Sequence, residues 1–167
     1  MTVKEDEMKR ILDPCCGSRM FWFDKHNEDV MFCDNRDLHT TLCDGRALEV
    51  QPDMLCDFTH LPFDDNTFYH VVFDPPHFVY AGQTSYTALK YGTLPKDWSS
   101  TIHDGFAECM RVLKPNGTLI FKWNEYQIPV KDVIKAIGQT PLYGHKSGKR
   151  SQTHWMAFIK DDNSKNA

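Results

Sequence analysis

The feature of this sequence that most constrains its fold is the alternation of short apolar runs with polar turns and helical segments. Such runs are typical of buried strands, and they occupy residues 11–12, 30–33, 54–56, 68–73, 118–123, 142–143 and 153–159. Helices are predicted at about residues 17–27, 96–113 and 129–137. Strands that alternate with helices favour a mostly parallel sheet, so we expect an α/β layered fold.

The connections between these segments carry turn signals. Asp44-Gly45 predicts a tight turn within extended chain between residues 39 and 57, and residues 79–95 are expected to form a long loop. The 167 residues suit one domain of ordinary size. We place this domain at residues 10–160, with a flexible N-terminus at 1–9 and a flexible C-terminal tail at 161–167.

The charge of the chain excludes some classes of function. With 19 Lys and Arg against 23 Asp and Glu, the formal net charge is −4, so the chain does not grip nucleic acid by bulk positive charge. One basic cluster stands at residues 145–150. It is either a solvated hairpin loop or a local site where Lys146, Lys149 and Arg150 steer a phosphate backbone.

Neither the cysteines nor the apolar runs predict a secreted, membrane or metal protein. No apolar run approaches the ~18 residues of a membrane span, and the charged first ten residues are unlike a secretory signal. None of the six cysteines forms a C-x-x-C pair, the nearest metal-like spacing being His39 with Cys43. We therefore expect a cytoplasmic protein with reduced thiols, no membrane partner and no metal. A Gly-x-Ser-x-Gly elbow is missing, which disfavours a hydrolase.

Acidic residues follow four of the predicted strands: Asp13, Asp34, Asp57 and Asp74. Ligands of open α/β sheets bind outside the carboxyl ends of the strands, so these positions form a candidate site, although Asp is also an ordinary turn former. The loop at residues 13–18 lacks the glycine spacing of a phosphate cradle. Asp34 lies 21 residues after Asp13, which suits an acid that binds ribose hydroxyls. The expected ligand has a ribose, tolerates a positive charge and has no pyrophosphate.

These residues resemble the class I S-adenosylmethionine-dependent methyltransferases. Residues 11–18 are similar to the first motif of that family, in the Leu-Asp-Pro-x-Cys-Gly-Ser-Gly variant of nucleic-acid amino-methyltransferases. Residues 61–72 resemble the approach to the fourth strand, and residues 111–119 resemble the helix, turn and fifth strand. The resemblance covers residues 10–160. It implies a Rossmann-like three-layer sandwich with a mostly parallel central sheet, helices on both faces and an antiparallel last strand.

The resemblance also implies S-adenosylmethionine as cofactor. Asp13, Cys16 and Gly17 would hold its methionine end, together with Pro14 and Ser18 of the same loop. Asp34 would bind the ribose, and Asp57 with Phe58 the adenine. One departure is Arg19, which stands where the family has a further glycine. Arg19 is less free than glycine to adopt φ > 0, which would weaken cofactor binding, unless it begins the helix instead.

Asp74-Pro75-Pro76-His77-Phe78 resembles the Asn/Asp-Pro-Pro-aromatic motif of enzymes that methylate exocyclic amines. A carboxylate oxygen and a backbone carbonyl can accept both hydrogens of an –NH₂ group and aim its lone pair at a methyl carbon. Two prolines fix the backbone, and an aromatic ring stacks on a flat acceptor. His77 replaces the usual aromatic residue, so either His77 or Phe78 supplies the stacking face, and His77 is also a candidate proton acceptor.

The implied function is N-methylation of an exocyclic amine of a nucleic-acid base, most simply adenine N6. Two alternatives stay open: a methyltransferase for a small molecule or a protein side chain, and a non-catalytic module that binds S-adenosylmethionine. A chain of this length leaves no room for a separate recognition domain. A nucleic-acid substrate would have to be contacted by Tyr80 and Tyr86 of the long loop, by the basic hairpin, or by another subunit in a homo-oligomer or a complex with a partner.

Overall fold

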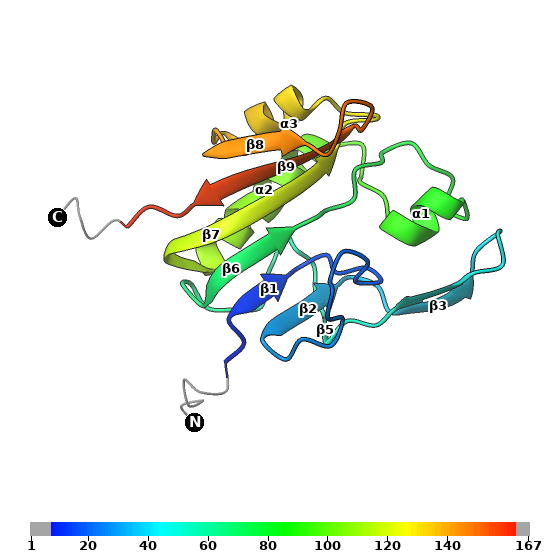
Figure 1. The fold of residues 1–167 in the computed structure, drawn as a ribbon, viewed down its shortest axis with the longest axis horizontal. Helices are drawn as coiled ribbons and strands as arrows, with labels where there is room; N and C mark the ends of the chain where they lie inside the picture. Colours follow the sequence, from blue (N-terminus) through cyan, green and yellow to red (C-terminus); the bar gives the residue numbers. More distant parts are fainter. Residues whose placement is uncertain (1–7, 163–167) are drawn as a thin grey trace.

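The computed structural model describes residues 8–162, and its centre is a seven-stranded sheet (Figure 1). Across the sheet the strands follow the order β5 (Met54–Leu55), β2 (Val30–Asp34), β1 (Ile11–Asp13), β6 (Phe68–Phe73), β7 (Leu113–Asn124), β9 (Thr153–Ile159) and β8 (Tyr143–Lys146). The first five are mutually parallel, whereas β9 runs antiparallel to both of its neighbours. The mostly parallel sheet and the antiparallel last strand are therefore confirmed. Of the predicted flexible ends, residues 1–7 and 163–167 lie outside the described residues.

The strand order creates one switch point in the sheet. From β1 the chain moves outward to β2 and β5, and it then returns to β6 on the other side of β1. Because neighbouring connections leave in opposite directions at such a point, a crevice opens outside the carboxyl ends of the strands. The residues that follow β1, β2, β5 and β6 therefore share one end of the sheet.

Helices α2 (Trp98–Val112) and α3 (Val130–Ile137) pack against each other and cover one face of the sheet. Strand side chains alternate between the two faces, and Leu12, Phe73 and Phe121 point to this one, where they are fully buried with Ile102 and Phe106 of α2. No helix within residues 8–162 is long and apolar enough to cross a membrane.

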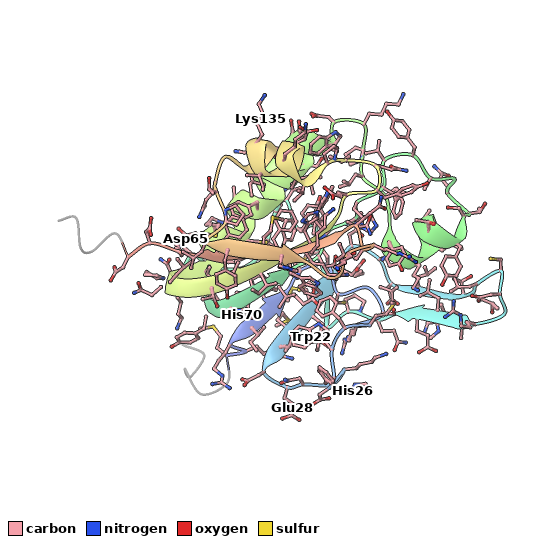
Figure 2. The ribbon with its side chains drawn as sticks, turned by 45° about the horizontal axis from the view of Figure 1, so that its top comes forward. Trp22, His26, Glu28, Asp65, His70 and Lys135 are labelled. Carbon is pink, nitrogen blue, oxygen red and sulfur yellow. The ribbon has the colours of Figure 1, made fainter. Side chains whose placement is uncertain are left out.

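The opposite face of the sheet is covered without a helix. Its buried cluster contains Val30 and Phe32, and Trp22 packs against them from the turn-rich segment of residues 14–29. Figure 2 shows Trp22 on the side of the sheet away from Lys135 of α3. The expectation of helices on both faces is therefore wrong for the described residues: the third layer exists, but it consists of turns.

The helix predicted at residues 17–27 is wrong because Arg19 takes a left-handed backbone conformation, with φ at +56°. A right-handed helix cannot continue through such a residue. The chain forms successive turns instead, in which Arg19 N donates to Cys16 O (2.8 Å) and Trp22 N donates to Arg19 O (3.2 Å). Arg19 thus adopts the positive φ that was expected to be unfavourable for it, and it does not begin a helix.

Contacts of the Arg19 side chain offset the cost of this conformation. Its guanidinium donates to Lys25 O (2.6 Å) and to Gln51 O (2.7 Å), and it pairs with Asp53 at 3.2 Å. The same group stands over the Phe32 ring, 3.9 Å from the ring centroid. These contacts tie the turn segment to β2 and to the chain that follows β4.

Two small elements stand beyond the carboxyl ends of the sheet (Figure 1). In one, β3 (Leu38–Thr41) and β4 (Ala47–Val50) form an antiparallel hairpin with its turn at Asp44-Gly45, as predicted. The other is α1 (Tyr86–Tyr91), which lies within the segment predicted as a long loop. Ser85 Oγ caps α1 by accepting a hydrogen bond from Ala88 N (3.2 Å), and Gly92 ends it at φ +74°.

The left-handed conformation at Arg19 predicts a difference between two substitutions. Arg19→Gly and Arg19→Ala both lose the guanidinium contacts, but only glycine adopts positive φ without strain. We expect both variants to be less stable than wild type, and Arg19→Ala to be less stable than Arg19→Gly by about 1 kcal/mol. Urea denaturation of the three proteins measures this difference. Equal stability of the two variants would contradict strain at this position.

Candidate active site

One cavity of about 430 Å³ opens at the switch point. The structure brings most of the predicted site residues to its wall: Pro14, Cys16, Gly17, Ser18, Asp34, Asp57, Phe58, Asp74, Pro75, Pro76 and His77. The opposite wall comes from α1 and the chain after it, through Lys90, Tyr91 and residues 93–95. The residues at four strand ends and a short helix thus enclose one space, which is called the first cavity below.

The loop after β1 is held to the end of β2 by two hydrogen bonds. Gly17 N donates to Asp34 Oδ2 (2.9 Å), and Cys16 N donates to Cys33 O (2.8 Å). Gly17 has φ +51°, and a Cβ built on it would meet nothing within 4 Å. Glycine is therefore favoured here by its backbone conformation, and the space above it stays open to the cavity.

Asp13 supports this loop from below and does not line the first cavity. Its side chain is fully buried, and it accepts hydrogen bonds from Trp22 Nε1 (2.8 Å) and from Cys15 N (3.2 Å). Burial raises the pKa of Asp13 to about 7, although the hydrogen bonds from these two donors lower it in part. In the structure this residue, which was predicted to contact the cofactor, instead holds the loop after β1 in place from beneath it.

Asp34 is buried and shared between the loop and an arginine. Arg36 donates to Asp34 Oδ1 from its backbone N (3.0 Å) and from Nε (3.1 Å), while within the described residues Oδ2 accepts only from Gly17 N. A carboxylate oxygen can accept two hydrogen bonds, so Oδ2 retains capacity for a ligand hydroxyl. Arg36 also donates from Nη1 to Leu89 O of α1 (2.8 Å), which connects Asp34 to the helix across the cavity.

Phe58 forms a flat apolar wall beside Asp57. Its ring packs edge-on against Phe73, with centroids 5.5 Å apart, and it lies directly over Gly105 of α2. A Cβ at Gly105 would approach Phe58 Cδ2 to 2.4 Å, so the ring occupies its place only because residue 105 has no side chain. Asp57 itself accepts from Thr59 N and Thr59 Oγ1, both at 2.8 Å.

Sequence reasoning missed Lys122, the charged partner of Asp74. Lys122 Nζ lies 2.8 Å from Asp74 Oδ2. Burial raises the pKa of Asp74, and the Lys122 ammonium opposes that rise. Burial and the same ammonium lower the pKa of His77 to about 4, so its imidazole is neutral near pH 7. A lone lysine within the apolar run at residues 118–123 is the signal that could have found it.

A second cavity of about 230 Å³ adjoins the first. The two share Asp74, His77, Tyr91 and Lys122, and the second is completed by Phe78, Asn124 and Thr153. Its aromatic side is continuous, because the His77 ring stands 4.3 Å from that of Phe78 and 5.6 Å from that of Tyr91, measured between centroids. Phe78 therefore faces the second cavity and not the first.

The predicted substrate contacts line neither cavity: Tyr80, Tyr86, Lys146, Lys149 and Arg150. Tyr80 is exposed, with its backbone N–H and carbonyl both bonded to Gln127. The Tyr86 hydroxyl accepts from Arg46 (2.6 Å) and from Lys90 (3.2 Å). Lys146 pairs with Glu125 at 2.8 Å.

The part of the chain that the structure describes holds no group of three or more His, Cys, Asp or Glu placed for a metal ion.

No protein-family model and no curated protein sequence matches the chain. Solved structures do match it. The PH0226 protein of Pyrococcus horikoshii superposes with a TM-score of 0.55 at 15% identity, over 95% of this chain and 84% of that one. A SAM-dependent methyltransferase from Methanosarcina mazei gives 0.53 at 12% identity, over 93% of each chain.

The chain has the Rossmann-like methyltransferase fold. A further match limits what this likeness says about chemistry: the [4+2]-cyclase SpnF superposes with a TM-score of 0.50 at 12% identity, over 92% of this chain and 75% of that one. One fold therefore carries more than one reaction, and the reaction has to be argued from the residues of the two cavities.

The burial of Asp13 predicts a pH dependence of stability. The pKa of an ordinary Asp is 3.8, and in the folded protein that of Asp13 is about 7. Between these values the folded state keeps a proton that the unfolded state has lost, so this group makes the free energy of unfolding fall as pH rises, by about 1.4 kcal/mol per pH unit.

Asp13→Asn removes this titration. Urea denaturation of both proteins between about pH 4.5 and 6.5 isolates the contribution of Asp13 as the change in their difference. We expect the wild type to lose stability relative to the variant as pH rises. Parallel curves would contradict the raised pKa.

Proposed function

We propose that this protein is an S-adenosylmethionine-dependent methyltransferase that acts on an exocyclic amine. The observation that carries the proposal is the junction of the two cavities at Asp74 and His77. On one side of the junction lie the Asp34 carboxylate, which can accept a further hydrogen bond, and the flat apolar ring of Phe58; a nucleoside requires both kinds of group. On the other side lies a smaller cavity with aromatic walls. Methyl transfer needs two ligands to meet at such a junction.

The residues of the first cavity fit the cofactor. Asp34 Oδ2 would accept from a ribose hydroxyl, Phe58 would stack on adenine, and the open space over Gly17 would take the methionine end. When bound, S-adenosylmethionine supplies a reactive methyl group on a positively charged sulfur. The anionic group of Asp34 suits that charge, and the loop at 13–18 has no phosphate-binding spacing.

The residues at the junction fit an amine acceptor. Lys122 binds Asp74 Oδ2, and within the described residues Asp74 Oδ1 carries no hydrogen bond. Oδ1 is thus available to accept one N–H of the amine, and the Pro75 carbonyl to accept the other, with Pro75 and Pro76 restricting the backbone between them. Phe78 and Tyr91 supply flat faces for a planar acceptor, which favours a nucleobase such as adenine.

A small-molecule acceptor is the second candidate, and one observation favours it. The residues expected to contact a nucleic acid lie outside both cavities, and Lys146 of the basic hairpin is neutralised by Glu125. A nucleic acid would therefore need recognition from a partner subunit or a second copy of the chain. Salt distinguishes the two candidates, because binding of a nucleic acid weakens steeply as salt rises, whereas that of an uncharged small molecule does not.

The first prediction from this proposal concerns the cofactor. In Gly105→Ala the new methyl group must displace the Phe58 ring, so we expect affinity for S-adenosylmethionine to fall about tenfold by calorimetry. Gly148→Ala is the matched control, because a Cβ at residue 148 meets nothing within 4 Å. Phe58→Ala should weaken binding as well. Wild-type affinity in both Gly105→Ala and Phe58→Ala would remove Phe58 from the cofactor site.

The second prediction concerns transfer. Wild-type protein with tritiated S-adenosylmethionine should label denatured DNA, RNA or a fraction of a cell extract, and the labelled fraction identifies the acceptor class. Asp74→Ala should abolish labelling while cofactor affinity stays close to that of wild type, because Asp74 orients the acceptor. Full activity of this variant would refute the role of Asp74. Binding of the cofactor without transfer to any acceptor would support the non-catalytic alternative.

A further inference from the structure

Lys122 is an unusual residue for its place in the sheet. It lies near the carboxyl end of β7 between Phe121 and Trp123, both of which are fully buried, and its side chain is 25% exposed. Side chains alternate along the strand, so Lys122 points to the face that α2 and α3 do not cover. It lines both cavities, and its ammonium is the only Lys or Arg group on the described wall of the second.

We propose that Lys122 is the positioning residue of the transfer step: it keeps Asp74 ionised and holds Asp74 Oδ2, so that Oδ1 alone faces the amine. The inference rests on the proposed function and adds a residue to it. A carboxyl group that has taken up a proton presents an O–H donor at one oxygen and accepts well only at the other, so a proton on Oδ1 would stop this oxygen from accepting an amine N–H. Ionisation of Asp74 therefore keeps Oδ1 an acceptor.

The surroundings of Asp74 make a counter-ion necessary. Asp13 is a neighbouring acid beneath the loop after β1, the Cys15 thiol lies on the same loop, and His77 on the loop of Asp74 itself is neutral near pH 7. The other cations on the first cavity have different partners. Arg36 pairs with Asp34, and Lys90 donates to Tyr86. Lys122 is thus the cation within hydrogen-bond distance of Asp74.

Two aromatic rings hold the ammonium in place. Lys122 Nζ lies 5.5 Å from the centroid of Phe21 and 5.7 Å from that of Trp155, and these rings meet edge to face at 6.0 Å. Ring faces attract a cation, and they also limit its access to water. Phe21 belongs to the turn-rich segment that replaces the predicted helix, and Trp155 belongs to β9. The non-helical third layer therefore builds the setting for Lys122.

The test is a set of three variants, Lys122→Met, Asp74→Asn and the double variant, assayed for transfer to denatured mixed-sequence DNA across pH. Lys122→Met should move the acid limb of the kcat profile up by about one pH unit, so that kcat falls about tenfold on that limb and less at higher pH, with little change in KM for S-adenosylmethionine. Adding Asp74→Asn to Lys122→Met should recover part of kcat and abolish the shift, since a neutral amide oxygen accepts without a counter-ion.

Lys114→Met is the matched control, because Lys114 lies on the same strand and its ammonium covers the ring of Tyr69, away from both cavities, with 4.1 Å between Nζ and the centroid. It should leave the profile unchanged. A Lys122→Met variant that loses activity equally at every pH and gains nothing from Asp74→Asn would overturn the proposal in favour of a structural role. A rise in KM for DNA with an unchanged kcat would overturn it too, because Lys122 would then bind an anionic group of the acceptor.

A second readout does not depend on turnover. The carboxyl carbon of Asp74, followed by NMR through a pH titration, should report a higher pKa in Lys122→Met than in wild type, by about one unit or more. An unmoved titration would overturn the proposal even if activity falls. A wild-type protein that transfers no methyl group would overturn the proposed function instead, and the NMR titration would still decide whether Lys122 keeps Asp74 ionised.

Discussion

The constraint on which this structure depends is the crowding of acidic groups at one end of a parallel sheet. Asp13, Asp34, Asp57 and Asp74 end or follow strands that meet at the switch point, and burial there raises the pKa of Asp13 and that of Asp74. Each of the four carboxyl groups has a different partner. Asp13 keeps a proton near pH 7, Asp34 takes an amide and an arginine, Asp57 takes a threonine, and Asp74 takes a lysine. These four solutions determine which oxygens remain free for ligands.

Much of the fold and of the site could be predicted because it depends on local patterns. Apolar runs that end in Asp mark strands and strand ends, and parallel strands bring their carboxyl ends together whatever lies between them. The helix at residues 17–27 failed because the conformation of Arg19 is set by Asp53 and Phe32, which lie far along the chain. Lys122 was missed for a related reason: the role of a lysine in an apolar run depends on Asp74, which comes directly after the neighbouring strand β6.

The contrast between the two cavities and the surface bears on how a substrate is chosen. The chemistry-bearing residues converge because strand ends converge, whereas the predicted substrate contacts were chosen from loops whose positions no periodicity determines. Those contacts bond to other parts of the same chain: Tyr86 to Arg46, Lys146 to Glu125, and the Tyr80 backbone to Gln127. They tie the loops around the cavities to the rest of the chain.

Arg36 gives the arrangement one further property. Its guanidinium donates both to Asp34, on one wall of the first cavity, and to the Leu89 carbonyl of α1, which belongs to the opposite wall. Gly92, at the end of α1, also leaves space that Arg36 and Pro76 fill. A ligand that changes how Asp34 holds Arg36 must change the free energy of placing α1, and thermodynamic linkage makes this effect reciprocal. A single side chain thus joins the occupancy of the first cavity at Asp34 to the placement of its opposite wall.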